Sequence, residues 1–119
     1  MIRALDHVQL AMPEGGEHRA VGFYAGVLGL AQVAKPQALA GRGGVWFERG
    51  AVRIHLGVET PFFPARKAHP AFEVDDLSAA RAALVAGGHP WQRDDDLPGL
   101  RRGFTYDPFG NRIELLERL

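Results

Sequence analysis

The amino-acid sequence predicts an α+β fold made of two copies of one βαβββ unit. These repeat units are residues 1–58 and 67–119, and together they form a single domain that covers residues 1–119. Three observations predict this fold: a faint internal repeat, the same succession of strand and helix patterns in both halves, and a metal-capable side chain near the start and the end of each half.

The internal repeat is clearest where each half ends. Residues 48–56 and residues 107–115 both finish with an Arg-Ile-x-Leu segment, and aligning the two places His55 opposite Glu114. Repetition of this kind is typical of a structural unit that has been duplicated. We therefore expect the two halves to superimpose.

The first half shows the expected succession of elements. Apolar and polar residues alternate over residues 3–12, as in a half-buried strand. An apolar stripe at helical spacing follows over residues 17–28, and Gly29 is placed to end this helix. The segment 59–67 holds two prolines and is interpreted as the joint between the halves. The remaining strands are predicted at residues 30–34, 43–48 and 52–58.

The second half repeats this order. A strand is predicted at residues 68–74 and a helix at residues 77–86, with Asp76 among the candidate N-caps and Gly87 and Gly88 at its end. The remaining strands are predicted at residues 89–93, 101–106 and 111–118.

Strand alternation places the metal-capable side chains on comparable faces. Successive side chains of a strand point to opposite sides of the sheet, so each predicted first and last strand has one apolar face that a helix could cover. The opposite face of these strands carries His7, His55, His69 and Glu114. If each sheet curls, these faces line a concave surface where imidazole and carboxylate groups could bind a divalent transition metal.

Composition narrows the possible functions. Fourteen basic residues offset fourteen acidic residues, so no basic surplus is available for a nucleic-acid partner. The chain has no cysteine, which excludes disulfides and Cys-type zinc sites. Asp6, His7 and Gln9 interrupt the N-terminal apolar residues, so we expect no signal peptide, no membrane partner and a cytoplasmic location.

Four segments also carry a family resemblance. They are Leu-Asp-His-Val at 5–8, Phe-Tyr-x-x-Val-Leu-Gly-Leu at 23–30, His-x-Ala-Phe-x-Val-Asp-Asp-Leu at 69–77 and Asp-Pro-x-Gly-Asn-x-Ile-Glu-Leu at 107–115. Together they span nearly the whole chain and resemble the glyoxalase, bleomycin-resistance and dioxygenase superfamily, also called the vicinal oxygen chelate superfamily. The resemblance implies cup-shaped, mostly antiparallel mixed sheets with the helices outside.

The resemblance also implies a metal site. Its ligand positions on the first and last strand of each unit correspond to His7, His55, His69 and Glu114, and Glu114 would also act as the catalytic base. Bacterial glyoxalase I has a carboxylate where this chain has His55, which leaves open whether His55 binds the metal. The dioxygenase-type and fosfomycin-type pattern needs only the other three residues.

Three further residues are predicted to line the substrate pocket. If Gly50 and Ala51 form a two-residue hairpin turn, Trp46 pairs with His55 and shares its face, as a wall of the cup or as part of the core. Gln9 shares the face of the first histidine, and Phe104 adds aromatic surface.

These observations favour a metal-dependent, glyoxalase-like lyase or isomerase. A divalent metal, either Zn, Ni, Mn or Fe, would act as a Lewis acid on a small-molecule substrate with adjacent oxygens. The alternatives are a metal-free drug-binding protein of the bleomycin-resistance type and an extradiol-type dioxygenase. We also expect a homodimer with sites shared between its chains, because a partner would cover exposed strand edges.

Overall fold

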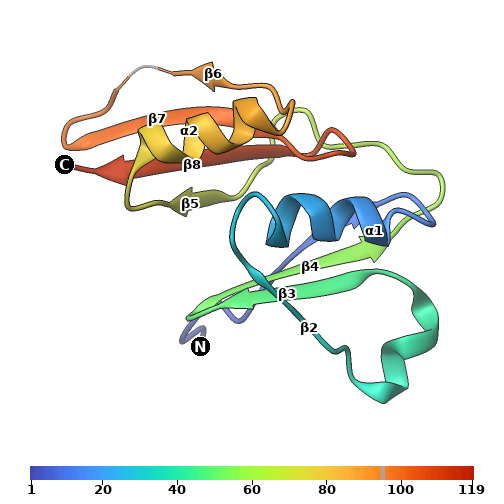
Figure 1. Ribbon diagram of the computed structural model, residues 1–119. Helices are drawn as coiled ribbons and strands as arrows, with labels where there is room; N and C mark the ends of the chain where they lie inside the picture. The colour runs from blue at the N-terminus through green and yellow to red at the C-terminus, as the bar shows by residue number, and fades with distance from the viewer. Residues whose placement is uncertain (95) are drawn as a thin grey trace. The chain divides into compact units, whose positions relative to one another are not determined.

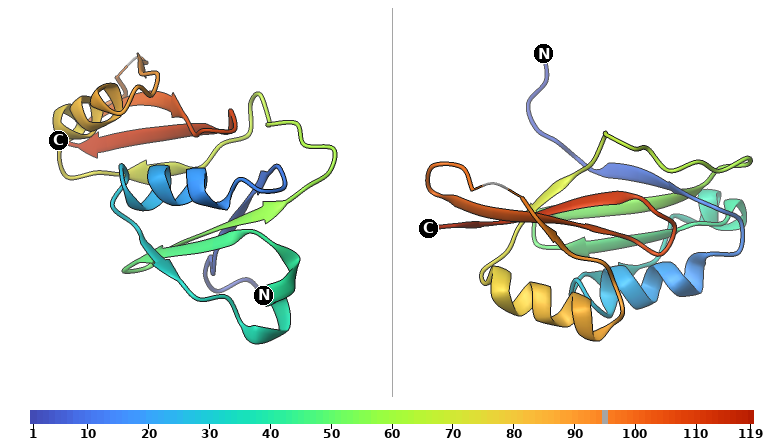
Figure 2. Two further views of the ribbon diagram at one scale, coloured as in Figure 1. Left: turned by 45° about the vertical axis from the view of Figure 1, so that its right-hand side comes forward. Right: turned by 90° about the horizontal axis from the view of Figure 1, so that it is seen from above.

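The computed structural model describes residues 1–94 and 96–119 and confirms the predicted α+β fold. The chain divides into two compact units, Met1–Phe63 and Pro64–Leu119. Each unit holds a four-stranded mixed sheet, and a helix lies along one face of each sheet (Figure 1, Figure 2).

The first unit follows the βαβββ pattern with one additional short helix. Its sheet has the strand order β1-β4-β3-β2, in which β1 runs parallel to β4 and the other neighbours are antiparallel. The elements are β1 (Val8–Met12), α1 (Glu17–Ala20), the π-helix η1 (Val21–Ala25), β2 (Ala31–Val33), the 3-10 helix η2 (Gln37–Arg42), β3 (Val45–Arg49) and β4 (Val52–Val58).

The second unit repeats the same connectivity. Its sheet has the order β5-β8-β7-β6, with β5 parallel to β8 and the other neighbours antiparallel. The elements are β5 (Ala71–Glu73), α2 (Leu77–Ala86), β6 (Gln92–Arg93), β7 (Leu100–Tyr106) and β8 (Arg112–Arg118).

Both sheets bury their helix-facing side chains. In the first unit Ile54 and Leu56 of β4, Phe23 of η1 and Phe47 of β3 are all almost fully buried. In the second unit the alternate residues Ile113 and Leu115 of β8, with Leu84 of α2, are equally inaccessible to solvent. This burial leaves the other face of each sheet for the metal-capable side chains.

The topology explains why these side chains come in pairs. The first and last strands of each unit are far apart in sequence but lie next to each other in the sheet. His55 of β4 therefore lies beside the strand that follows His7, and Glu114 of β8 lies beside the strand that follows His69.

Some predicted strand bounds are wrong, and two of the differences have a structural explanation. The strand predicted at 3–12 begins only at Val8, because the register of β1 against β4 leaves residues before Asp6 beyond the end of their partner (Figure 2). The strand predicted at 68–74 begins at Ala71, after Pro70, which has no N–H to donate. The carbonyl of Pro70 still accepts a hydrogen bond from the Glu114 N–H at 3.0 Å.

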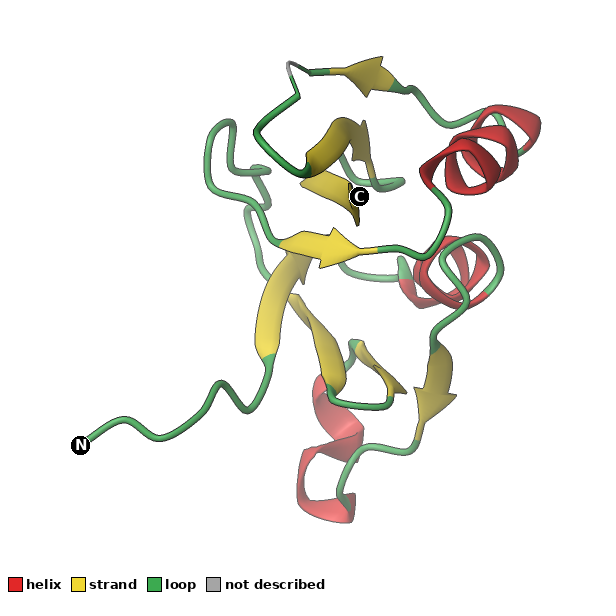
Figure 3. Ribbon diagram, turned by 90° about the vertical axis from the view of Figure 1, so that its left-hand side faces the viewer, coloured by secondary structure: helices red, strands yellow, loops and turns green. Residues whose placement is uncertain are grey.

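Helix details also differ from the prediction. The helix predicted at 17–28 is α-helical only over Glu17–Ala20 and continues as a π-helix, with Gly26 N–H bonded to the carbonyl of Val21. The 3-10 helix η2, visible in Figure 3 as a short helix, was not predicted. In the described part of the chain, no helix has the length and apolar character needed to cross a membrane.

Candidate metal centre

The second unit brings His69 and Glu114 into direct contact. Nε2 of His69 lies 3.1 Å from Oε1 of Glu114. The parallel pairing of β5 with β8 sets Ala71 opposite Glu114, which places the preceding histidine beside the carboxylate. Glu114 is only 8% exposed, so this carboxylate needs a positive partner to offset its desolvation.

The hydrogen bonding of His69 shows what must lie between the two groups. Nδ1 of His69 lies 2.8 Å from the carbonyl oxygen of Lys67, which can only accept, so Nδ1 carries a proton. If the ring were neutral, Nε2 would then direct a lone pair at a carboxylate oxygen. The pair therefore requires one additional positive charge between its atoms, either a proton or a metal ion.

The geometry and chemistry of this pair suit a metal. Two ligand atoms bound tetrahedrally at about 2.0–2.1 Å lie roughly 3.3 Å apart, close to the 3.1 Å between His69 and Glu114. The bond from Nδ1 to the Lys67 carbonyl fixes the tautomer that leaves Nε2 for a metal, as second-shell partners commonly do.

Arg102 is a functional neighbour that the sequence did not single out for this role. Its Nη1 lies 3.4 Å from Oε1 of Glu114, and its Nη2 lies 3.1 Å from Oδ2 of Asp94. Arg102 precedes Phe104 by two residues and so shares its face, a period-two signal that could have identified it. It adds positive charge beside the carboxylate and competes with any metal for the same oxygen.

Phe104 contacts both His69 and Arg112 on this face. Its ring meets the His69 ring edge-on with centroids 5.1 Å apart, and the Arg112 guanidinium lies 3.9 Å from its centroid. Nε of Arg112 is buried and has no hydrogen-bond partner among the described residues. Phe104 is itself buried, and its ring packs against both the His69 ring and the Arg112 guanidinium.

In the first unit three rings stack across neighbouring strands. Trp46 stacks on His55 with parallel planes and centroids 3.7 Å apart, and His7 stacks on His55 with centroids 4.2 Å apart. Because β4 lies between β1 and β3, His7 and Trp46 flank His55 from opposite sides. The register also pairs Trp46 with His55, as expected for the hairpin turn at Gly50.

Charges around this stack are arranged in a chain. Asp6 contacts Nδ1 of His7 at 2.9 Å and Arg53 at 3.0 Å, and Arg53 also contacts Glu48 at 3.3 Å. The hydrogen bond with His7 and the charge of Arg53 lower the pKa of Asp6. Burial, followed by the charge of His7, lowers the pKa of His55 and favours its neutral, metal-binding form.

Gln9 and Trp46 line a small hollow in the first unit. This hollow has a volume of about 190 Å³ and includes Leu39 and Arg42 of η2. The Gln9 side chain lies over Gly57, where a Cβ would come within 3.0 Å of its Cδ atom. Two of the three predicted pocket residues therefore share one hollow.

The candidate ligands thus occur as two pairs, His7 with His55 and His69 with Glu114. Among the described residues, no group of three or more His, Asp or Glu side chains is gathered in a way that could hold a metal ion. The ligand set predicted from the sequence, with Glu114 as base, remains a proposal.

Comparisons with known proteins establish the family. The family model described as the Glyoxalase/Bleomycin resistance protein/Dioxygenase superfamily matches residues 4–115. The chain therefore belongs to this superfamily, which confirms the resemblance of its motifs. No curated protein matches the chain.

Solved structures support the assignment. A glyoxalase family protein from Bacillus anthracis shares 42% identity with the chain over 100% of this chain and 98% of that one, with a TM-score of 0.94. The fosfomycin resistance protein FosX from Listeria monocytogenes is 15% identical over 100% and 96% of the two chains, with a TM-score of 0.80. The antibiotic-binding protein TnmS3 from Streptomyces is 22% identical over 99% and 100%, with a TM-score of 0.73. The last two likenesses concern the fold alone.

Proposed function

We propose that this protein is a metal-dependent, glyoxalase-like enzyme that acts on a small molecule with adjacent oxygens. The observation that carries the proposal is the contact between His69 and Glu114, a part-buried nitrogen–oxygen pair between which a proton or a metal ion would lie. Two histidines and one carboxylate form a donor set that suits zinc, iron and related divalent ions. His7 is the proposed third ligand.

The two units contribute different donors to this proposed set. His7 has its Nδ1 occupied by Asp6, which leaves Nε2 for a metal. His55 stacks on His7, and its lowered pKa keeps it neutral, so it is proposed either as a fourth ligand or as a support for His7. The donors could come from one chain or from two.

The chain's own residues would orient the substrate and move its proton. When bound, the metal would supply Lewis-acid chemistry, polarising the substrate oxygens. Oε2 of Glu114 has no hydrogen-bond partner among the described residues, so it is free to accept a substrate proton. Arg102 would hold Oε1 in place, and Trp46 and Gln9 would provide a wall for the substrate.

A specific observation favours one alternative, metal-free binding of an aromatic compound. The stack of His7, His55 and Trp46 presents flat rings on which a planar molecule could lie. Under this alternative, a proton rather than a metal would lie between His69 and Glu114, and Arg102 would add positive charge beside the carboxylate.

Metal content separates the two functions. The protein would be purified without a histidine tag or chelator, and zinc, nickel, manganese and iron would be measured by elemental analysis. We expect about one divalent ion per chain in the wild type and in the control His18→Ala, because His18 is exposed on α1. His69→Ala should lose most of this metal. A metal-free wild type that also fails to bind added metal would leave the aromatic-binding alternative.

We also propose that the working unit is a homodimer whose sites are shared between chains. Two-fold dimers are the commonest soluble assemblies, and a partner could cover open strand edges such as those of β2 and β6. Shared sites would combine the His7 and His55 pair of one chain with the His69 and Glu114 pair of the other.

A further inference from the structure

On the face of the second sheet that carries Glu114, one arginine lacks a counter-ion. Strand alternation places three arginines of β7 and β8 on this face: Arg102, Arg112 and Arg118. Arg102 pairs with Glu114 at 3.4 Å, and Arg118 pairs with Glu73 at 3.0 Å. Arg112 forms no ion pair or hydrogen bond with any residue that the structure describes. Its charge is therefore available to a ligand.

The ring of Phe104 fixes the orientation of this guanidinium. The Arg112 Cζ atom lies 3.9 Å from the ring centroid, a stacked cation–π contact. The Nε atom at the inner end of the guanidinium is buried, whereas neither Nη atom is buried without a partner, so the outer end is open to a ligand. Withdrawing part of a cation from water without a counter-ion costs free energy, which a bound anion would offset.

This open guanidinium lies close to the candidate metal centre. Phe104 pairs in register with Glu114, and its ring also meets the His69 ring, with centroids 5.1 Å apart. Arg112 precedes Glu114 by two residues on the same face, which separates their Cα atoms by about 6.5 Å along the strand. A small molecule bound at His69 and Glu114 could therefore reach the arginine as well.

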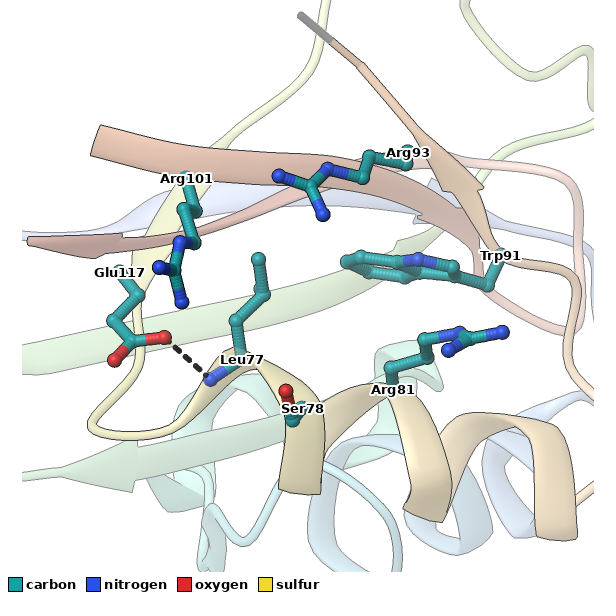
Figure 4. Close-up of a pocket in the computed structure, with 7 residues that line it drawn as sticks. All are labelled: Leu77, Ser78, Arg81, Trp91, Arg93, Arg101 and Glu117. Atoms are coloured by element: carbon teal, nitrogen blue, oxygen red, sulfur yellow. Dashed lines mark hydrogen bonds between the residues drawn. The ribbon is translucent and has the colours of Figure 1, made fainter. Parts of the chain in front are cut away.

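The helix side of the same sheet arranges its cations differently. It holds a cavity of about 430 Å³, in which the Trp91 indole packs on Gly103, where a Cβ would lie 2.7 Å from its Cη2 atom. Figure 4 shows Arg81 and Arg101 at different ends of this cavity, with the indole between them. Arg101 also pairs in register with Glu117. This cavity therefore does not gather its positive charge at one point.

From these observations we propose that Arg112 binds the carboxylate of the substrate, which is a small monocarboxylic acid that also carries adjacent oxygens. The inference rests on the proposed function, because it names the substrate class of the same site. The two Nη atoms of one guanidinium match the two oxygens of one carboxylate. One unpaired arginine balances one negative charge, which favours a carboxylate over a phosphate dianion. The adjacent oxygens would lie toward His69 and Glu114.

The test is an NMR titration of the full-length ¹⁵N-labelled protein with glycerate, glycerol and inorganic phosphate. The readout is the Nε–H signal of Arg112, assigned by its loss in Arg112→Lys. The Nε–H of Arg118, which donates to Glu73 on the same face, is the internal control. Glycerate should shift the Arg112 signal saturably, phosphate only at higher concentration, and glycerol not at all. No shift with glycerate, an equal response to glycerol, tighter binding of phosphate, or equal shifts at both arginines would each overturn the proposal.

Matched variants separate a specific site from general charge attraction. With the Tyr106 amide as readout, since this residue pairs with position 112, Arg112→Gln should weaken glycerate binding about tenfold or more. Arg112→Lys should fall between this variant and wild type. Arg118→Gln removes the same charge from the same strand and should leave binding unchanged; equal weakening by it would refute the site. Metal content is measured separately, so a protein that binds metal but not glycerate refutes this inference alone.

Discussion

The turn between β7 and β8 is held by hydrogen bonds to the side chain of Asp107, and its contribution to stability can be tested directly. Oδ1 of Asp107 accepts hydrogen bonds from the N–H groups of Phe109 and Asn111, both at 2.9 Å. Its Oδ2 accepts a third from the Asn111 side-chain amide at 2.8 Å. Asp107 and Asn111 are 5% and 6% exposed, so water cannot easily replace these bonds.

Asp107→Ala should therefore be strongly destabilising. Three hydrogen bonds to a carboxylate are lost, and each contributes on the order of 1 kcal/mol net or more. We expect the free energy of unfolding to fall by about 3–4 kcal/mol, measured by urea denaturation followed by circular dichroism. The melting temperature should fall by roughly 10–15 °C.

Two controls define the result that would refute this account. Asp107→Asn keeps one oxygen for the two backbone donors and should lose only about 1–2 kcal/mol. Asp75→Ala, at an exposed loop position, should change stability by less than about 0.5 kcal/mol. If the alanine and asparagine variants at position 107 are equally stable, the carboxylate does not hold the turn in this way.

Three further predictions concern packing, pH and assembly. Gly103→Ala should lower stability by about 1–3 kcal/mol because the indole packed on it must move, whereas Gly22→Ala, which meets nothing within 4 Å, should be neutral or stabilising in the same urea assay. In metal-free protein, NMR should give His55 a pKa below about 6.5. The unfolded chain then binds this proton more readily, so the contribution of His55 to the free energy of unfolding is complete above about pH 6.5 and is lost as the pH falls through the folded-state pKa. A His55→Gln control should not show this loss. The His7→Ala and Glu114→Ala proteins would be denatured and refolded together. If sites are shared between chains, each dimer made of one chain of each variant should regain about one metal ion. No metal should return if each site lies within one chain or the protein is a monomer.

Much of the fold was predictable because its signals are local. Alternating apolar residues, the apolar stripe after residue 16 and the Asp107–Asn111 turn each act within a few residues of sequence. The helix Leu77–Ala86 has the predicted bounds, with Asp76 capping the Ala79 N–H. The conversion of the first helix to a π-helix and the formation of η2 were missed, since neither has a distinct periodicity.

The sequence predicted which residues belong to the candidate site, but not which of them are in contact. Period-two alternation identified His55 and Glu114 as residues on the face away from the core, and the repeat matched each with an upstream histidine. The arginine partner of Glu114 is Arg102 on the neighbouring strand, and not Arg112 on its own strand. Arg112 instead lies over the Phe104 ring.

Short stretches of sequence determine the strands, the turns, the duplication and the kind of donor on each strand, because backbone geometry and side-chain alternation depend on near neighbours. The contacts of each side chain depend instead on which strands become neighbours and in what register they pair. The parallel pairing of β5 with β8 and of β1 with β4 joins residues more than 40 positions apart, and no local pattern encodes it. That pairing sets His69 against Glu114, stacks His7 on His55, and leaves a cationic cavity on the helix side of the second sheet.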